Sequence, residues 1–212
     1  MRPCIVLFAK APAPGRVKTR LSAMLNDRQT VEIHEAFVRD MLEKLLPMEP
    51  RADVELHTDT PTDAWRDIEV SRHRQIEGDL GARMYHAMFS GLGEGRPHVL
   101  IVGSDAPTLP PGHLRRLLES TADVALGPSE DGGYYAIACR RTDPEMFAGV
   151  EWSSPRALEQ TVRACEACGL AVTLGEAWHD VDTPEDLARL AGESGVPWHT
   201  RAWIGRYRSL FT

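Results

Sequence analysis

Dense cysteine spacing, an excess of positive charge and long apolar runs are all missing from this sequence. The four cysteines in 212 residues predict reduced thiols and a cytoplasmic location rather than a disulfide-stapled secreted domain. The formal net charge of −7 argues against nucleic acid as a partner, because nucleic-acid binders neutralise phosphates with broad basic surfaces. The first apolar run, residues 4–9, is too short for membrane insertion and resembles a buried strand rather than a signal peptide.

Several common catalytic motifs are missing as well. None of the eight histidines falls in H-E-x-x-H, and no G-x-S-x-G occurs, so zinc and serine hydrolases have no support. Val17 stands where a Walker A loop needs glycine, and no G-x-G-x-x-G is present. Cys165 and Cys168 form a C-x-x-C within a helical pattern, but without a second pair a metal or redox role is a minor alternative.

Short apolar runs alternate with segments of helical period, and this alternation predicts βα units in a three-layer α/β/α fold with a mostly parallel sheet. The hydrophobic content of 42% supports one sizeable core, and no repeat, low-complexity tract or long linker divides the chain. We therefore expect a single domain over residues 1–212, with its motifs between about 4 and 190. Strands are expected at 4–9, 53–57, 74–76, 99–103, 124–126, 134–138 and 172–174.

Apolar spacing and capping signals predict the helices between these strands. Pro47 and Pro50 should stop the first helix, and Gly169 is placed to end a later one. The aromatic residues of 197–212 predict that this tail packs back on the body. Helices are expected over 26–46, from Asp79 to about Leu92, after Pro110-Pro111 with Leu114, Leu117 and Leu118 inward, and over 155–168.

An aspartate follows the apolar run 99–103 and precedes a proline turn. Because the carboxyl ends of parallel strands form the ligand crevice of an open sheet, Asp105 is expected where the chemistry occurs. Asp180 and Asp182 follow another short strand-like run, and Mg²⁺ commonly takes one or two carboxylates with phosphates and water. We expect Asp105 and Asp182 to hold Mg²⁺ or Mn²⁺. The alternative is that the later acids only decorate a helix entry.

That helix entry has its own signals. Thr183 is expected as the N-cap, Pro184 as the first helical residue and Asp186 as the capping-box acid. Asp180 and Asp182 then lie outside the helix and are free to serve elsewhere.

A basic loop follows the first strand. It carries Lys10, Arg16, Lys18 and Arg20 within eleven residues, with Gly15 in a proline-glycine turn. Extended backbone N–H groups and side-chain charge suit a polyphosphate, so these five residues are expected to bind nucleotide phosphates. A solvated basic surface loop is the alternative.

Two glycine-containing turns are further candidates. Gly78, Asp79 and Gly81 stand at a probable helix start, where backbone N–H groups and the helix dipole favour a nucleotide, although capping explains Asp79 equally well. In the second turn, candidate acceptor-binding residues lie beyond a strand, although an Asp-Gly hairpin also explains them. These candidates are Asp131, Gly132, Gly133 and Tyr134.

These motifs together resemble the radical-SAM/selenodomain-associated transferase family, which has the nucleotide-diphospho-sugar transferase (GT-A) fold. The resemblance rests on residues 8–12, 14–21, 78–81, 103–107, 127–129, 131–135 and 180–184. The Lys-Thr-Arg-Leu element at 18–21 and the acidic segment 180–186 also resemble 2-phospho-lactate guanylyltransferases and molybdenum-cofactor nucleotidyltransferases. The chain departs from the wider nucleotidyltransferase pattern because it lacks a glycine-rich L-x-x-G-x-G-x-R loop.

The resemblance implies a divalent metal on Asp105 and Asp182, with Lys18 and Asp105 as catalytic residues and the basic loop on the donor phosphates. A glycosyltransferase that uses a nucleotide-diphospho-sugar and a small-molecule acceptor is the first expectation. One alternative is a nucleotidyltransferase that uses a nucleoside triphosphate and releases pyrophosphate. Another is a nucleotide-binding sensor without turnover. The sequence does not indicate an oligomeric state.

Overall fold

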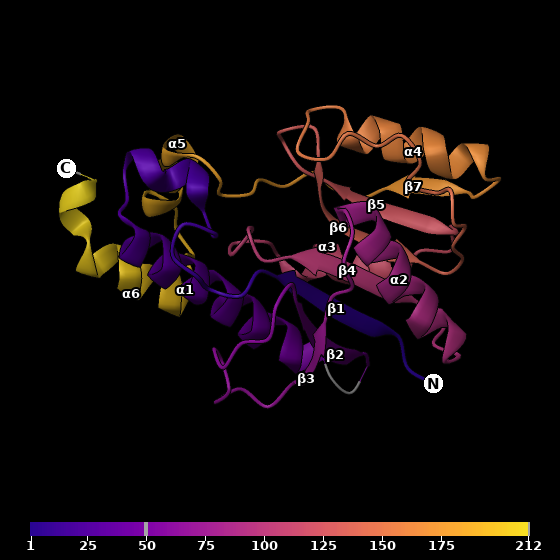
Figure 1. Ribbon diagram of the computed structural model, residues 1–212, viewed down its shortest axis with the longest axis horizontal. Coiled ribbons are helices and arrows are strands. Elements are labelled where there is room, and N and C mark those ends of the chain that lie inside the picture. The colour runs from indigo at the N-terminus through magenta and orange to yellow at the C-terminus, as the bar shows by residue number, and fades with distance from the viewer. Residues whose placement is uncertain (49–50, 212) are drawn as a thin grey trace.

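A computed structural model describes residues 1–48 and 51–211, so Pro50 and Thr212 lie outside the described residues. Its centre is a seven-stranded sheet of order β3-β2-β1-β4-β6-β5-β7 (Figure 1). Among the described strands, β6 runs antiparallel to both of its neighbours, and the other neighbouring pairs are parallel, which confirms the expected mostly parallel sheet. The strands are β1 (Cys4–Ala9), β2 (Asp53–Thr58), β3 (Ser71–Arg74), β4 (Val99–Gly103), β5 (Val124–Pro128), β6 (Tyr134–Cys139) and β7 (Val172–Leu174).

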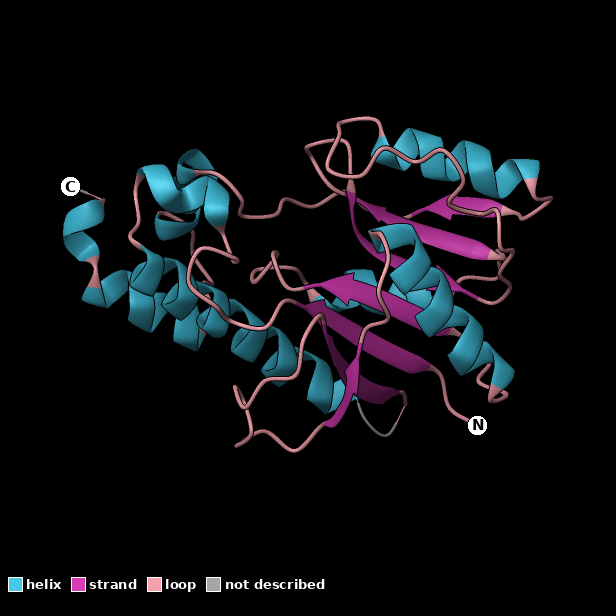
Figure 2. Ribbon diagram, viewed as in Figure 1, coloured by secondary structure: helices cyan, strands magenta, loops and turns pink. Residues whose placement is uncertain are grey.

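Helices cover both faces of this sheet (Figure 2). Alternate residues of β1 point to opposite faces: Ile5 and Leu7 pack with α1 and α3, whereas Cys4 and Val6 pack with α2 and α4. The result is the three-layer α/β/α arrangement expected from the sequence. The helices are α1 (Asp27–Leu45), α2 (Leu80–Gly93), α3 (Pro111–Leu118), α4 (Ala157–Ala167), α5 (Pro184–Ala191) and α6 (Trp198–Arg206), with 3₁₀ turns η1 (Thr19–Ala23), η2 (Leu46–Met48) and η3 (Arg208–Leu210).

The predicted helix ends follow from local hydrogen bonding. The carboxylate of Asp79 accepts the Ala82 N–H at 2.8 Å and caps α2. Thr183 and Asp186 form the expected capping box at the start of α5. Gly169 adopts φ +69° after α4, a left-handed conformation that ends a helix and favours glycine.

The third predicted strand was misplaced. It was expected over 74–76, but β3 covers Ser71–Arg74 and pairs with β2 alone at the edge of the sheet. Its Ser-Arg-His-Arg sequence is mostly exposed and carries no apolar alternation. The apolar Ile76 that suggested the later position is 37% exposed and lies beyond the strand. An edge strand needs fewer apolar side chains, so hydrophobic pattern locates it poorly.

The C-terminal residues pack on α1. Figure 1 shows α1, α5 and α6 together at one end of the molecule, where the chain also ends. Trp203 of α6 is buried in a cluster with Phe37 of α1 and Leu187 of α5. Asp40 of α1 caps the first turn of α6: its buried carboxylate accepts the backbone N–H groups of His199 at 3.0 Å and Thr200 at 2.8 Å.

All four cysteines lie among the described residues and are free thiols. Within residues 1–48 and 51–211, none of the helices is both long enough and apolar enough to cross a membrane.

Replacing Asp40 by alanine should destabilise the protein by about 2–3 kcal/mol, because it leaves buried donors of α6 without an acceptor. Chemical denaturation of the variant and the wild type measures this difference in unfolding free energy. Glu43→Ala is the matched control, since Glu43 lies one turn along α1, is 53% exposed and pairs only with the His199 side chain in the described part. It should cost less than about 1 kcal/mol. Equal losses in the two variants would contradict the capping role.

Candidate functional site

A cleft of about 490 Å³ opens where β1, β3 and β4 end. Because these strands are parallel, their carboxyl ends lie at the same end of the sheet. The segments that follow the strands form the walls of the cleft. The cleft carries charges of both signs among apolar side chains. Its charged lining consists of Lys10, Lys18, Arg20, Arg83, Asp105, Asp131 and Asp182.

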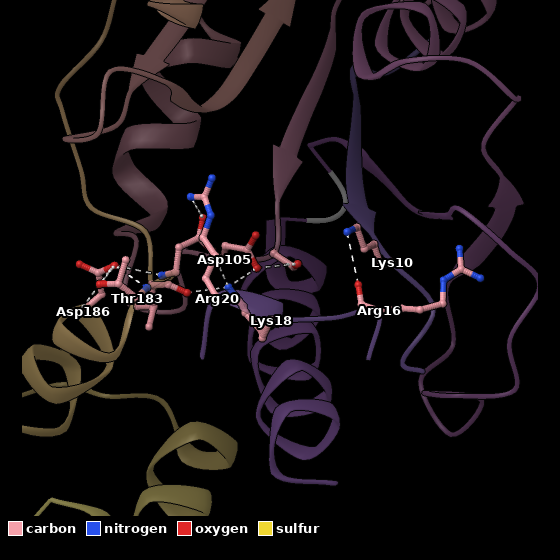
Figure 3. A network of polar contacts seen from close by, with 10 residues as sticks. Lys10, Arg16, Lys18, Arg20, Asp105, Thr183 and Asp186 are labelled. Carbon is pink, nitrogen blue, oxygen red and sulfur yellow. Dashed lines mark hydrogen bonds and ion pairs between the residues drawn. The ribbon is translucent and has the colours of Figure 1, made fainter. Parts of the chain in front are cut away.

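The ammonium group of Lys18 contacts both predicted metal ligands, and Figure 3 shows it beside Asp105. Its Nζ lies 2.6 Å from Oδ1 of Asp105 and 3.1 Å from Oδ1 of Asp182. It also donates a 2.6 Å hydrogen bond to the backbone carbonyl of Val181, whose own N–H donates to the carbonyl of Asp105. Residues separated by more than 160 positions in the sequence therefore meet at one buried charge.

The backbone of Lys18 is strained. Its φ of 47° and ψ of 39° place a non-glycine residue in the left-handed region at the entry to η1. The side chain is 3% exposed, and Nζ lies 5.1 Å from the centre of the Phe37 ring. Ser153, which also lines the cleft, has φ 61°. In the described part of the chain three non-glycine residues have positive φ, and two of them line this cleft, which is typical of a functional site.

Burial and charge oppose each other at this cluster. Burial favours a neutral lysine, but Asp105 and Asp182 outweigh it and raise the pKa of Lys18 above its usual value. Partial burial acts to raise the pKa of Asp105, yet the Lys18 ammonium outweighs it and holds that pKa below its usual value. The lysine and the aspartate are therefore both charged at neutral pH.

Negative charge is in excess beside this ion pair. Burial and the nearby carboxylates of Asp131, Asp182 and Asp105 raise the pKa of Asp180 to about 7. Lys18 contacts Oδ1 of Asp105 and Oδ1 of Asp182, so Oδ2 of Asp105 is outside the lysine contacts and Oδ2 of Asp182 faces only the longer contact with Arg20 among the described residues. Carboxylate oxygens are the ligands that Mg²⁺ and Mn²⁺ prefer, and a divalent cation would relieve the repulsion that Asp180 experiences. The donor set therefore fits a hard divalent metal.

The predicted cations of the basic loop do not all reach this cluster. Arg20 lies 3.8 Å from Oδ2 of Asp182. Lys10 lines the cleft and donates to the Arg16 carbonyl at 3.4 Å. Figure 3 shows Lys10 and Arg16 apart from the Lys18 contacts. The Arg16 guanidinium lies 3.4 Å from Asp59 and is 61% exposed, and among the described residues it is not part of the cleft lining.

Glycines near the start of α2 have different surroundings. Gly15, in the loop after β1, and Gly78, before α2, have positive φ, and neither is part of the cleft lining among the described residues. A Cβ on Gly81 would lie 2.8 Å from the Trp152 ring and 3.0 Å from Phe147, so packing alone explains glycine at that position. Asp79 uses its carboxylate as the α2 cap. A nucleotide contact by Gly15, Gly78, Asp79 or Gly81 stays a prediction.

The second glycine turn is a tight connection between β5 and β6. Oδ1 of Asp131 accepts the Ser129 hydroxyl at 2.8 Å and the Gly133 N–H at 2.9 Å. Gly132 has φ +89°, and a Cβ there would lie 2.1 Å from the Pro155 carbonyl oxygen. The hairpin explanation therefore accounts for these glycines. Asp131 nevertheless lines the cleft, so acceptor binding by this turn stays a prediction.

A second cavity, of about 140 Å³, adjoins the cleft. Phe8, Leu80, Gly103 and Asp105 line both, so the two spaces adjoin at the end of β4. Tyr134 lines this smaller cavity with Asp180 and several apolar side chains. It is the more apolar of the two spaces, and its size suits the organic part of a small molecule.

More than half of the chain matches one protein family. The family described as "Uncharacterized protein conserved in bacteria (DUF2064)" matches residues 33–154. The chain belongs to this family. Curated relatives include proteins named 2-phospho-L-lactate guanylyltransferase: the one from Haloarcula marismortui is 26% identical, over 82% of this chain and 79% of its own. The one from Methanocorpusculum labreanum is 29% identical, over 84% and 78%.

Solved structures agree with this family fold. A protein from Desulfovibrio desulfuricans G20, described provisionally as a nucleotide-diphospho-sugar transferase, has a TM-score of 0.88 and 30% identity over 100% of this chain and 97% of its own. A CMP:2-keto-3-deoxy-manno-octonic acid synthetase in complex with CTP has a TM-score of 0.60 at 15% identity, over 90% and 97%, which shows the fold alone.

These likenesses make this DUF2064 chain a transferase and confirm the fold class and the relationship to 2-phospho-lactate guanylyltransferases. The sequence analysis also allowed a nucleotide-binding sensor without turnover, and the similarity to transferases does not support that alternative. Membership of the narrower radical-SAM-associated family, and the likeness to molybdenum-cofactor enzymes, stay predictions.

Several residues lining the cleft of this DUF2064 chain were not among the site residues selected from the sequence, including Arg83, His34 and Gln75. Arg83 projects from the first turns of α2 and donates to the Gly78 carbonyl at 2.9 Å. His34 of α1 contacts the Lys10 carbonyl, and burial lowers its pKa, which favours a neutral ring. Gln75 follows β3 and donates from its amide to the His57 carbonyl. Arg83 was recoverable, since it follows the glycines of the α2 start, but His34 lies within a helical apolar pattern and carried no signal.

Asp180→Asn should stabilise the metal-free protein at alkaline pH. The folded-state pKa of about 7 lies above the usual 3.8, so wild-type stability falls as the pH rises through this window and the full penalty applies above it. Near pH 8 the variant should gain on the order of 1–2 kcal/mol, less than the full shift implies because the group is only partly buried. Near pH 4 the difference should vanish. Chemical denaturation of both proteins in the presence of a chelator, from about pH 4 to about pH 8, measures the difference in unfolding free energy. A difference that does not change with pH would contradict the raised pKa of Asp180.

Proposed function

We propose that the chain is a metal-dependent nucleotidyltransferase that joins a nucleoside monophosphate to a small phosphorylated acceptor. The observation that carries this proposal is the meeting of Asp105 and Asp182 on Lys18 in a cleft that also holds Lys10 and Arg20. The similarity to several guanylyltransferases supports nucleotidyl transfer over glycosyl transfer, the order opposite to the one expected from the sequence. The missing glycine-rich loop does not outweigh that similarity, because the relatives match over most of their length.

In this reaction an acceptor oxygen attacks the α-phosphorus of a nucleoside triphosphate. A new P–O bond forms, the bond from the α-phosphorus to the bridging oxygen breaks, and pyrophosphate leaves with that oxygen. An acceptor phosphate is largely ionised near neutral pH, since its second pKa is about 6, so it can attack without a protein base. The proposed reaction therefore needs no general base from the protein.

The chain's own cations meet the charge that builds on the departing pyrophosphate. Lys10, Lys18 and Arg20 line the cleft from the segment that follows β1, and Arg83 lines it from α2. Asp105 and Asp182 fix the Lys18 ammonium before substrate arrives, so this charge needs little reorganisation. Mg²⁺ or Mn²⁺ held by Asp105 and Asp182, when bound, would supply further neutralisation of the donor phosphates.

The smaller cavity supports a place for the acceptor. It adjoins the donor cleft at the end of β4, where Asp105 lines both spaces, so an acceptor there would present its reactive oxygen to the phosphates. The volume of about 140 Å³ suits a small acceptor, and Tyr134 would contact it. The free thiols and the use of nucleoside triphosphates suit the cytoplasmic location expected from the sequence.

Glycosyl transfer is the second candidate. It is favoured by the description of the Desulfovibrio desulfuricans protein, the relative with the TM-score of 0.88. The same carboxylates and cations would then bind a nucleotide-diphospho-sugar, and a nucleoside diphosphate would leave in place of pyrophosphate.

Incubation with Mn²⁺, 2-phospho-L-lactate or other small phosphomonoesters, and each of the four nucleoside triphosphates should release pyrophosphate with at least one pair. Parallel reactions with nucleotide-diphospho-sugars should yield no nucleoside diphosphate above the hydrolysis background. Release of nucleoside diphosphate from a sugar donor, with no pyrophosphate from any triphosphate, would contradict nucleotidyl transfer and support the second candidate.

Removing a single charge should lower activity when the charge lies in the cleft and should leave activity unchanged when it lies elsewhere on the surface. Arg20→Met should lower kcat/KM for the triphosphate by about 10- to 100-fold, because it removes a cation from the phosphate site. Asp105→Asn should lower turnover by at least about 100-fold. Arg141→Met is the matched control, since Arg141 is 63% exposed, pairs with Asp123 beyond the opposite end of β6 and should leave both parameters unchanged. Equal losses in Arg20→Met and Arg141→Met would contradict the proposed phosphate site.

A further inference from the structure

Three metal-ligand side chains meet on the edge strands of the sheet, outside the carboxylate cluster of the cleft. Glu55 and His57 are two residues apart on β2 and so point to the same face. His73 of β3 is the direct partner of His57 in the parallel register. The sheet geometry therefore brings these three side chains together.

Their ligand atoms converge closely. Oε2 of Glu55 lies 2.9 Å from Nε2 of His57 and 3.7 Å from Nε2 of His73. All three ligand atoms lie within 4.8 Å of one another. Zinc bonds of about 2.0–2.2 Å in tetrahedral geometry place neighbouring ligand atoms roughly 3.4 Å apart, so small side-chain adjustments suffice to hold one ion.

The surroundings hold this group in place. Arg96 donates to the other oxygen of Glu55 at 3.0 Å, which orients the carboxylate and leaves Oε2 toward the histidines. Asp53 balances the Arg96 charge at 2.7 Å. The Phe8 ring stacks on His57 at a centroid distance of 5.8 Å.

A cavity of about 140 Å³ lies beside these ligands, between the sheet and α2. His86 of α2 also lines it, so a further imidazole or water could complete the coordination. Phe8, Gln75 and Arg83 line both this cavity and the donor cleft. An ion here would therefore fix β3, and the Gln75 that follows it, against the wall of the cleft.

A second group of similar composition provides a contrast. Asp40, Glu43 and His199 also place three ligand atoms within 4.8 Å, in the part of the chain that the structure describes. There, however, the Asp40 carboxylate accepts three hydrogen bonds from His199 and Thr200 as the cap of α6. A metal would have to break that cap, whereas the contacts that Oε2 of Glu55 makes to His57 and His73 would be replaced by bonds from all three side chains to the ion.

We propose that Glu55, His57 and His73 bind a borderline divalent transition metal, Zn²⁺ by ligand preference, in a site separate from the hard-metal site of the cleft. Two imidazoles and one carboxylate suit Zn²⁺ or Co²⁺, whereas Mg²⁺ prefers oxygen ligands alone. The role assigned to this ion is to clamp the edge strand β3 to β2. This proposal does not depend on the reaction proposed above.

Co²⁺ titration of the chelator-treated full chain tests this site through its visible d–d absorption. One equivalent should produce an intense band typical of low coordination number. Zn²⁺ should abolish the band, and a large excess of Mg²⁺ should leave it. His73→Gln should weaken binding by at least about tenfold. Because His73 is 52% exposed on the edge strand, this variant should keep its fold, which circular dichroism checks.

His199→Gln is the matched control, since it removes an imidazole from the capped group and should leave the band unchanged. Absence of a band in the wild type would overturn the proposal, as would equal binding by wild type and His73→Gln, or displacement of Co²⁺ by Mg²⁺. Zinc-edge anomalous diffraction from wild-type crystals gives a reading that needs no variant. The peak must lie among Glu55, His57 and His73, and a peak elsewhere would also overturn the assignment.

Discussion

The buried ammonium of Lys18 is the interaction on which the geometry of the cleft depends. It draws together the loop after β1, the end of β4 and the segment before α5, through Asp105, Asp182 and the Val181 carbonyl. A buried lysine is unfavourable without compensation, and here two carboxylates and a carbonyl provide it. The strained backbone at Lys18 is held by these same contacts, so the cation is positioned before any substrate enters.

The carboxylates around the Lys18 ammonium carry more negative charge than this one cation can neutralise. The pKa of Asp180 is raised as a result, because Asp180 is partly buried and its charged form is repelled by Asp131, Asp182 and Asp105. Such a surplus is unfavourable in the folded chain alone and becomes favourable once a divalent cation and a polyphosphate share the cleft. The repulsion among the carboxylates and the proposed binding of metal and nucleotide are thus two aspects of one electrostatic arrangement.

Sequence reasoning located the elements whose own residues carry a strong physical signal. The apolar runs of β1 and β4 gave their bounds, and the capping residues Asp79 and Thr183 gave helix starts. The rule that carboxyl ends of parallel strands form the crevice brought Asp105 to the site. Edge strand β3 was misplaced because one-sided pairing needs no apolar alternation.

Contacts between distant segments were out of reach of the sequence. Nothing local to Lys18 shows that it lies between two carboxylates, and nothing local to Arg16 shows that its side chain turns to Asp59. Gly81 and Gly132 resemble ligand-binding glycines in the sequence, yet the neighbours that require them are Trp152 and the Pro155 carbonyl. The preference for glycosyl over nucleotidyl transfer rested on one missing loop, whereas the similarity to guanylyltransferases supports the nucleotidyl alternative.

A crystal structure with Mn²⁺ and a non-hydrolysable nucleoside triphosphate analogue tests the convergence of metal, phosphate and lysine most directly. The manganese anomalous peak should lie in contact with Asp105 and Asp182, with the triphosphate against Lys18 and Arg20. A peak remote from both aspartates, or a triphosphate bound away from Lys18, would contradict the proposed site.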